Sequence, residues 1–189
     1  MRCPSHLRTE RLVLRRWTAA DRAPLSELNA DPEVMRYFPA TLSAAQTDHF
    51  IDVADARLAH DGFGLWAVET DGAFIGYAGL ARPSFHAAFT PTVDISWRLA
   101  RHAWGFGYAT EAARAVLDDG FSRIGLSEVV AYTTHTNQRS RAVMQRLGMT
   151  HDPNDDFDHP RLPTTSPLRR HVLFRLPAND WTASTGRPQ

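Results

Sequence analysis

The sequence predicts a single α+β domain built on a mixed sheet, and three observations predict it. Apolar runs and periodic stretches follow one another in the order strand, helix, helix, three strands, helix, strand, helix, strand. Two apolar runs meet at Asp71-Gly72, a step typical of an antiparallel hairpin. Residues 92–134 read as strand, long helix, strand, which is a crossover that joins two parallel strands.

The first third of the chain predicts one strand and two helices. Residues 7–17 alternate apolar and polar side chains, as an opening strand with one buried face does. A capping pattern at 18–21 starts a helix that ends near Ala30. Ser43 starts a second helix, which ends before Gly62.

The second half carries the clearest helical pattern. Apolar positions over 109–124 fall at helical spacing and form one continuous stripe, and a shorter helix is expected over 138–147. A closing strand is expected over 171–176. The polar, proline-rich stretch 151–170 is too long for a routine connection, so we expect a functional or a mobile loop. We expect disorder over 181–189.

Composition bounds the kind of protein. The 189 residues are 43% hydrophobic, and 21 basic side chains balance 21 acidic ones, which fits one domain over 1–180. Nucleic acid and anionic membranes both reward a basic excess, so neither is expected as a partner. One cysteine, Cys3, cannot form an internal disulfide, and neither a signal peptide nor a run of about 20 apolar residues is visible. We therefore expect a cytoplasmic protein.

The stretch RLARHAWGFGYATEAA is the most informative, because a strand passes through a glycine turn into the long helix. Gly105 and Gly107 let the backbone come close to a ligand, and free N–H groups from about residue 104 to 110 lie at the positive end of the helix dipole. This arrangement favours a pyrophosphate site. Two alternatives are a plain strand-to-helix turn and a dinucleotide fingerprint, although Thr110 replaces the third glycine of the latter.

Two motifs extend this interpretation. His102, Gly105 and Gly107 match a Q/R-x-x-G-x-G/A pattern with histidine in the first place, and GYATEA follows. After the next strand come Asn137-Gln138-Arg139-Ser140 and then Leu147-Gly148-Met149. Over roughly residues 7–176 the chain resembles the GNAT superfamily of acyl-CoA-dependent N-acyltransferases, and in particular its branch of Rim-type protein N-terminal acetyltransferases.

The resemblance implies a mostly antiparallel central sheet of six to seven strands flanked by about four helices, with acetyl-CoA as the acyl donor. It places the pyrophosphate on the glycine turn, the pantetheine arm along the strand edge, and two further side chains on the other side of that arm. The residues so implied for the donor are Trp97, Leu99, His102, Trp104, Gly105, Phe106, Gly107, Tyr108, Ala109, Thr110, Asn137 and Ser140.

Acyl transfer to an amine needs donors for the developing oxyanion and a proton for the departing thiolate. A backbone N–H near Trp97 is the family-like oxyanion donor. Where many family members place a tyrosine for the leaving group, this chain has Met144, which cannot donate a proton. Ser140 is then the nearest hydroxyl of the motif, and its alternative role is that of a helix cap.

The amine must also lose a proton. Asp94 on the fourth predicted strand, His135 after the fifth and a water chain are the three candidate bases. Tyr37, Phe38 and Phe85 are expected to line the acceptor channel. The acids and histidines of 151–170 match neither a zinc nor an EF-hand spacing, so no metal is expected.

These observations predict an N-acetyltransferase that acts on a primary amine by direct attack in a ternary complex. A protein N-terminus and a small-molecule amine both remain open as acceptors, and the chain is expected to be a monomer or a homodimer. The alternatives are a non-catalytic CoA-binding regulatory module and a nucleotide-cofactor oxidoreductase.

Overall fold

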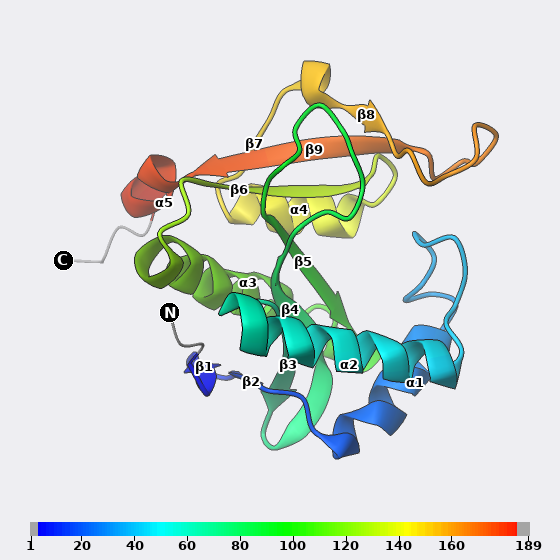
Figure 1. Cartoon of the computed structure of the whole chain (residues 1–189), viewed down its shortest axis with the longest axis vertical. Helices are drawn as coiled ribbons and strands as arrows, with labels where there is room; N and C mark the ends of the chain where they lie inside the picture. Colours follow the sequence, from blue (N-terminus) through cyan, green and yellow to red (C-terminus); the bar gives the residue numbers. More distant parts are fainter. Residues whose placement is uncertain (1–3, 185–189) are drawn as a thin grey trace.

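The computed structural model describes residues 4–184, with side chains described for 4–181, so Cys3 lies outside the described residues. Nine strands form one sheet (Figure 1): β1 His6–Arg8, β2 Val13–Arg15, β3 Leu65–Thr70, β4 Ala73–Ala81, β5 Asp94–Leu99, β6 Glu128–Thr134, β7 Thr150–His151, β8 Phe157–Asp158 and β9 Arg170–Pro177. The α-helices are α1 Arg22–Ala30, α2 Ala44–Asp61, α3 Tyr108–Asp119, α4 Gln138–Arg146 and α5 Ala178–Ser184.

The sheet runs in the order β1-β2-β3-β4-β5-β6-β9-β7, and β8 also pairs with β9. Every pairing is antiparallel except β5 with β6, which the crossover through α3 makes parallel. This confirms the expected fold class. The strand number exceeds the expected six to seven because the opening segment splits in two and two-residue strands form at Thr150–His151 and Phe157–Asp158.

The opening segment forms a hairpin, where the sequence predicted one strand. The Thr9 hydroxyl accepts the Leu12 amide at 2.9 Å, and the Thr9 amide donates to the Leu12 carbonyl at 3.0 Å, so the chain turns between β1 and β2. Glu111 of α3 holds this turn, because its carboxylate accepts the Thr9 hydroxyl at 2.5 Å and the Arg11 amide at 3.0 Å. A contact about a hundred residues away in sequence therefore decides this local structure.

The predicted helix caps are present. Thr18 and Asp21 form a capping box before α1, and Ser43 and Gln46 form one at the start of α2. The hairpin between β3 and β4 turns through Asp71 with φ of 49° and Gly72 with φ of 77°, as the Asp-Gly step predicts.

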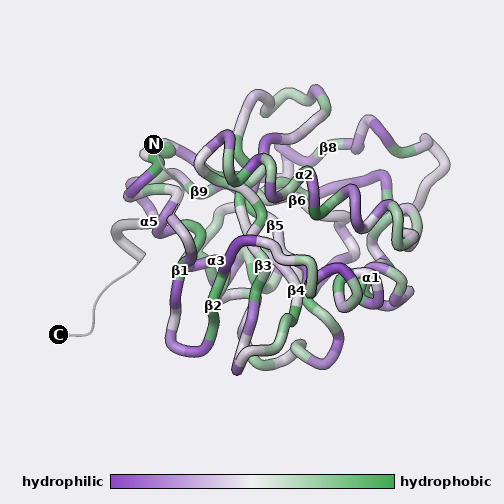
Figure 2. The backbone as a smooth tube through the Cα atoms, turned by 60° about the horizontal axis from the view of Figure 1, so that its bottom comes forward, coloured by the Kyte–Doolittle hydropathy of each residue, from purple (hydrophilic) through white to green (hydrophobic). Residues whose placement is uncertain are grey.

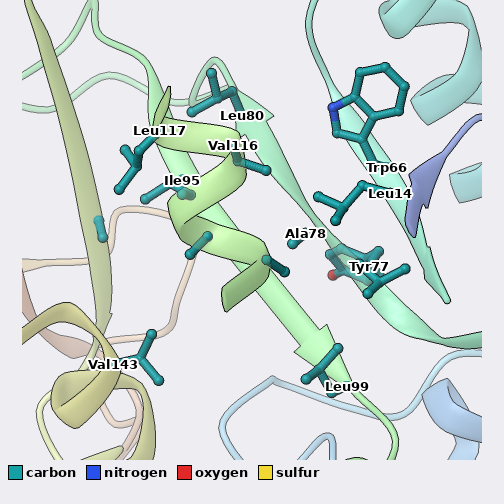
Figure 3. Close-up of a cluster of buried hydrophobic side chains, with 14 of the residues drawn as sticks. Leu14, Trp66, Tyr77, Ala78, Leu80, Ile95, Leu99, Val116, Leu117 and Val143 are labelled. Atoms are coloured by element: carbon teal, nitrogen blue, oxygen red, sulfur yellow. The ribbon is translucent and has the colours of Figure 1, made fainter. Parts of the chain in front are cut away.

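Two helical layers cover the two faces of the sheet. On one face Tyr77 packs against Phe50 of α2 at 5.1 Å between ring centroids. On the other face Val116 and Leu117 of α3 lie beside Leu80 and Ile95 of the sheet (Figure 3). The hydrophobic stretches of the chain follow the strands in the middle of the molecule (Figure 2).

The C-terminal part differs from the expectation in two ways. Residues 151–170 are partly ordered by pairing with β9, through β7 and β8. Helix α5 continues to Ser184, so residues 181–184 are helical where disorder was expected, and 185–189 lie outside the described residues. Within residues 4–184, every helix is too short or too polar to span a bilayer.

Candidate functional site

A single opening in the sheet creates the site. Strands β5 and β6 pair only at Asp94 and Val130 and then diverge. Figure 1 shows β6 and β9 crossing above β5, which runs down toward β4. A groove of about 1570 Å³ occupies this opening and is lined by β5, the glycine turn, the start of α3, the end of β6 and the start of α4.

The exposed edge of β5 offers backbone groups to this groove. The Ala100 amide donates to Ile75 of β4 and the Val93 carbonyl accepts from Val130 of β6, so residues 93, 95, 97 and 99 point their backbone groups away from β4. Ile95 directly follows the β5–β6 pair at Asp94, and Trp97 is the next of these residues, where the two strands have parted. The Leu99 carbonyl accepts the Trp104 indole N–H at 2.8 Å, which fixes the start of the glycine turn against the strand.

The glycine turn presents amide groups at the N-terminus of α3. Gly105 and Gly107 have φ of 86° and 83°, a region that side chains disfavour. The first bond of the helix runs from the Glu111 amide to the Gly107 carbonyl. Among the described residues, no protein group accepts a hydrogen bond from the amides of Gly107 to Thr110, all four of which line the groove. These amides are therefore free to donate hydrogen bonds to an anion, as the amides of helix N-termini do.

The start of α4 lies on the opposite wall. Asn137 is the N-cap of this helix, because its side-chain oxygen accepts the Ser140 amide at 3.3 Å. Its side-chain nitrogen donates to the Ser140 hydroxyl at 3.1 Å and to the Thr133 hydroxyl at 3.0 Å. The Ser140 hydroxyl proton is therefore available to a ligand in the groove. Met144, one turn on, also lines it.

Asp94 lies at the apex where the strands part. It is 7% exposed, lines the groove, and burial raises its pKa to about 7, with the backbone and Arg57 opposing that shift. A carboxyl group that titrates near neutral pH is suited to accept a proton from a substrate.

Three further groove residues were not predicted from the sequence. Tyr132 of β6 lines the groove, and burial, with the charge of Asp94, raises the pKa of its hydroxyl, so it stays protonated. His159 and His171 also line it, with ring centroids 5.1 Å apart, and burial lowers the pKa of both. The sequence held a signal only for Tyr132, because the alternation of β6 puts Tyr132 on the same face as Val130.

The pleat of the sheet divides the groove into two faces. The backbone register puts Asp94, Arg98, Tyr132 and His171 on the face covered by α1 and α2. Trp97, by alternation, projects to the face covered by α3 and α4, where the glycine turn lies. We call these the α1/α2 face and the α3/α4 face of the groove.

Of the three residues predicted for the acceptor channel, two line the groove. Tyr37 and Phe38 line the groove. Phe85 does not, and instead packs behind it against His159 at 4.6 Å between centroids.

Two predicted histidines also lie apart from the groove lining. His102 is exposed on the turn before Trp104, and its side chain is not among those that line the groove. His135 is exposed and pairs with the Arg170 carbonyl, at 3.4 Å from its Nδ1 atom. The remaining residues expected to contact the donor all line the groove.

The acids and histidines of 151–170 pair within the protein, as His151 and Asp156 do at 2.7 Å. Over the described part of the chain, no group of three His, Cys, Asp or Glu side chains is placed to hold a metal ion. The absence of a metal stays a prediction.

Comparison with known proteins bears on this geometry. The family model described as acetyltransferase (GNAT) domain matches residues 11–150. The protein YkkB of Bacillus subtilis is 32% identical over 152 residues, which cover 79% of this chain and 87% of YkkB. The FsC-acetyl coenzyme A-N(2)-transacetylase of Aspergillus fumigatus is 34% identical over 66% of this chain and 56% of its own length.

Solved structures agree in fold. An acetyltransferase of Agrobacterium tumefaciens matches with a TM-score of 0.73 and 28% identity, covering 93% of this chain and 95% of that one. RimL, a ribosomal-protein acetyltransferase solved with coenzyme A, matches with a TM-score of 0.75 and 14% identity, over 93% of this chain and 99% of RimL.

Proposed function

The chain belongs to the GNAT family of acetyltransferases, and from that premise we propose that it transfers the acetyl group of acetyl-CoA to a primary amine by direct attack in a ternary complex. The observation that carries the proposal is the parting of β5 and β6 after a single pair, with the free amides of α3 at the edge of the resulting groove.

The donor fits the α3/α4 face. The pyrophosphate of acetyl-CoA binds the amides of Gly107 to Thr110, where the helix dipole favours its charge. The pantetheine arm pairs with the backbone of Trp97 as an added strand would, opposite Asn137 and Ser140. The name of the Aspergillus relative, an acetyl coenzyme A transacetylase, and the coenzyme A bound to RimL support this donor.

The chemistry then follows from the groups around the parted strands. The amine nitrogen attacks the thioester carbonyl carbon, a C–N bond forms and the C–S bond breaks. Asp94 takes the amine proton, and the Trp97 N–H donates to the developing oxyanion. The Ser140 hydroxyl donates to the departing sulfur. No acid is then needed at position 144, where this chain has Met144.

The acceptor approaches from the α1/α2 face, between Tyr37 and Phe38 on one side and His159 on the other. A protein N-terminus and a small amine both fit a groove of this size. Action in the cytoplasm, as a monomer or a homodimer and without nucleic acid or membrane, remains our prediction.

Two measurements test the proposal. Coenzyme A is expected to raise the Tm while NAD leaves it unchanged, because the glycine turn lacks the third glycine of the dinucleotide fingerprint. Thiol release from acetyl-CoA is expected to rise above background with at least one member of a panel of primary amines. Tight coenzyme A binding with no turnover on any amine would favour the non-catalytic CoA-binding module instead.

A further inference from the structure

The guanidinium of Arg98 is held rigidly on the α1/α2 face of the groove. Its Nη1 donates to the Asn29 side-chain oxygen at 2.6 Å, and Asn29, fully buried, is itself fixed by the Thr47 hydroxyl at 3.1 Å. The Phe38 ring lies 4.0 Å from the guanidinium carbon and the Tyr77 ring 5.3 Å from it. One nitrogen and the flat face of this cation are therefore fixed by the protein.

The other edge of the same guanidinium has no protein partner. Nε is buried without a hydrogen bond, and neither it nor Nη2 contacts an acceptor or a carboxylate among the described residues. These two atoms form the edge that binds a carboxylate through two parallel N–H bonds. Arg16 illustrates the geometry, since its Nε and Nη2 each lie 2.7 Å from an oxygen of Asp55.

A half-buried cation without a counter-charge is costly, which favours a ligand that supplies the charge. Acetyl-CoA is not that ligand, because its phosphates belong at the N-terminus of α3, on the α3/α4 face. Arg98 projects to the α1/α2 face, where its guanidinium packs against Phe38. Asp94 lies on the same face of β5. The anion must therefore belong to the acceptor.

Resting on the proposed function, we infer that the acceptor is a small amine that carries a carboxylate, and that the guanidinium of Arg98 binds this carboxylate. Asp94 and Arg98 are four residues apart on one face of β5, about 13 Å between their Cα atoms. An acceptor held at Arg98 extends its amine along the strand toward Asp94 and the thioester. A peptide N-terminus presents a neutral amide where such an acceptor presents its carboxylate.

The test uses pairs of acceptors that differ only in charge. We compare amino acids with their carboxamides as acceptors for the full chain. The amino acids range in length from glycine to γ-aminobutyrate and include some with larger side chains. The wild type is expected to prefer the best carboxylate over its carboxamide by about 10- to 100-fold in kcat/KM. In Arg98→Gln this preference is expected to vanish through a raised KM, with the KM for acetyl-CoA unchanged. Arg98→Lys, which keeps the charge without the two-pronged edge, is expected to fall between them.

Arg36→Gln is the matched control. Arg36 lies near Phe38 in the connection between α1 and α2, but it is exposed and does not line the groove. It is expected to keep the wild-type preference. A wild type that acetylates carboxamides as well as carboxylates, or an Arg98→Gln variant that binds coenzyme A normally and keeps the preference, overturns the inference while leaving the transferase intact. Coenzyme A binding with no acetylation of any amine, peptides included, overturns the proposed function itself and this inference with it.

Discussion

The two faces of the groove offer different kinds of chemical group to a ligand. On the α3/α4 face the groups that we propose to bind the donor are mostly backbone amides, at Gly107 to Thr110 and along β5. On the α1/α2 face the groups that line the groove are side chains, such as Asp94, Arg98 and Tyr132. Backbone groups depend on chain conformation, so only substitutions that alter the path of the chain or fill the space above it disturb them. Side chains, in contrast, are lost to a single substitution, and each one sets a particular chemistry.

This difference predicts the largest effect at a glycine. Gly107→Val places a β-branched side chain at φ of 83°, among the amides of the anion site. Coenzyme A binding is expected to weaken by about 100-fold or more, from backbone strain and lost charge-assisted hydrogen bonds. Titration calorimetry with coenzyme A measures it.

Gly125→Val is the matched control for that measurement. Gly125 has a similar φ of 77°, with open space where its side chain would lie, and it follows the π-helical turn Gly120–Ile124 that continues α3. This variant is expected to lose stability but keep its coenzyme A affinity. Equal losses of affinity in both variants would mean that strain alone, and not the anion site, explains the effect.

The next effect belongs to the α1/α2 face. Asp94→Asn is expected to lower kcat by about 100- to 10,000-fold with coenzyme A affinity unchanged, because a general base is lost. In the wild type kcat/KM is expected to rise with pH through about 7, as the carboxyl deprotonates. The variant is expected to lack this limb. A variant profile that keeps it would assign the base elsewhere.

The pH dependence of thermal stability tests the raised pKa of Asp94 independently. Because burial raises the pKa of Asp94 to about 7 in the folded chain, folding favours the protonated carboxyl, and its stabilising contribution is lost as the pH rises through that value. Asp94→Asn is therefore expected to raise the Tm relative to the wild type by an amount that grows from about pH 4, near the pKa of an unfolded aspartate, to about pH 7 and then levels off. Thermal melts from about pH 4 to about pH 8 measure it, and a difference in Tm that stays constant between about pH 4 and pH 7 would contradict the raised pKa.

The two faces also differ in how far the sequence predicted them. The α3/α4 face comes from contiguous segments with local signals, namely the glycine turn and the Asn-x-x-Ser start of α4. Nearly all the residues predicted there line the groove, and their contacts with the donor stay a prediction. The α1/α2 face gathers side chains from β5, β6, the connection after α1 and the segment before β9. Which of those meet depends on strand register and long-range pairing, which no short motif encodes.

The errors have the same origin. Phe85 packs against His159 behind the groove, so an aromatic residue in a loop was placed correctly near the site but not in its wall. The opening hairpin depends on Glu111, far along the chain. Helix caps, the Asp-Gly hairpin and the long apolar stripe are local patterns, and all of these elements were predicted.

A smaller effect is expected at the start of α4, on the α3/α4 face. Ser140→Ala is expected to lower kcat by about tenfold, because the hydrogen bond to the departing sulfur is lost, and to leave the Tm unchanged. Asn137 is the cap, so Asn137→Ala is expected to cost about 1 kcal/mol of stability. Chemical denaturation and steady-state kinetics on both variants separate the roles. A Ser140→Ala variant that loses stability and keeps wild-type kcat would make Ser140 a structural residue.

The smallest effect is expected at His135, the other candidate base. Its side chain is exposed, is not among the groove-lining residues, and is directed to the Arg170 carbonyl. His135→Ala is therefore expected to keep kcat and the pH profile within about twofold, and stability within about 0.5 kcal/mol. The contrast with Asp94 tests position, because both side chains are candidate bases and only Asp94 lines the groove. If His135→Ala removed the limb near pH 7, the base would approach from the end of β6, and the division of the groove into a donor face and an acceptor face would have to be redrawn.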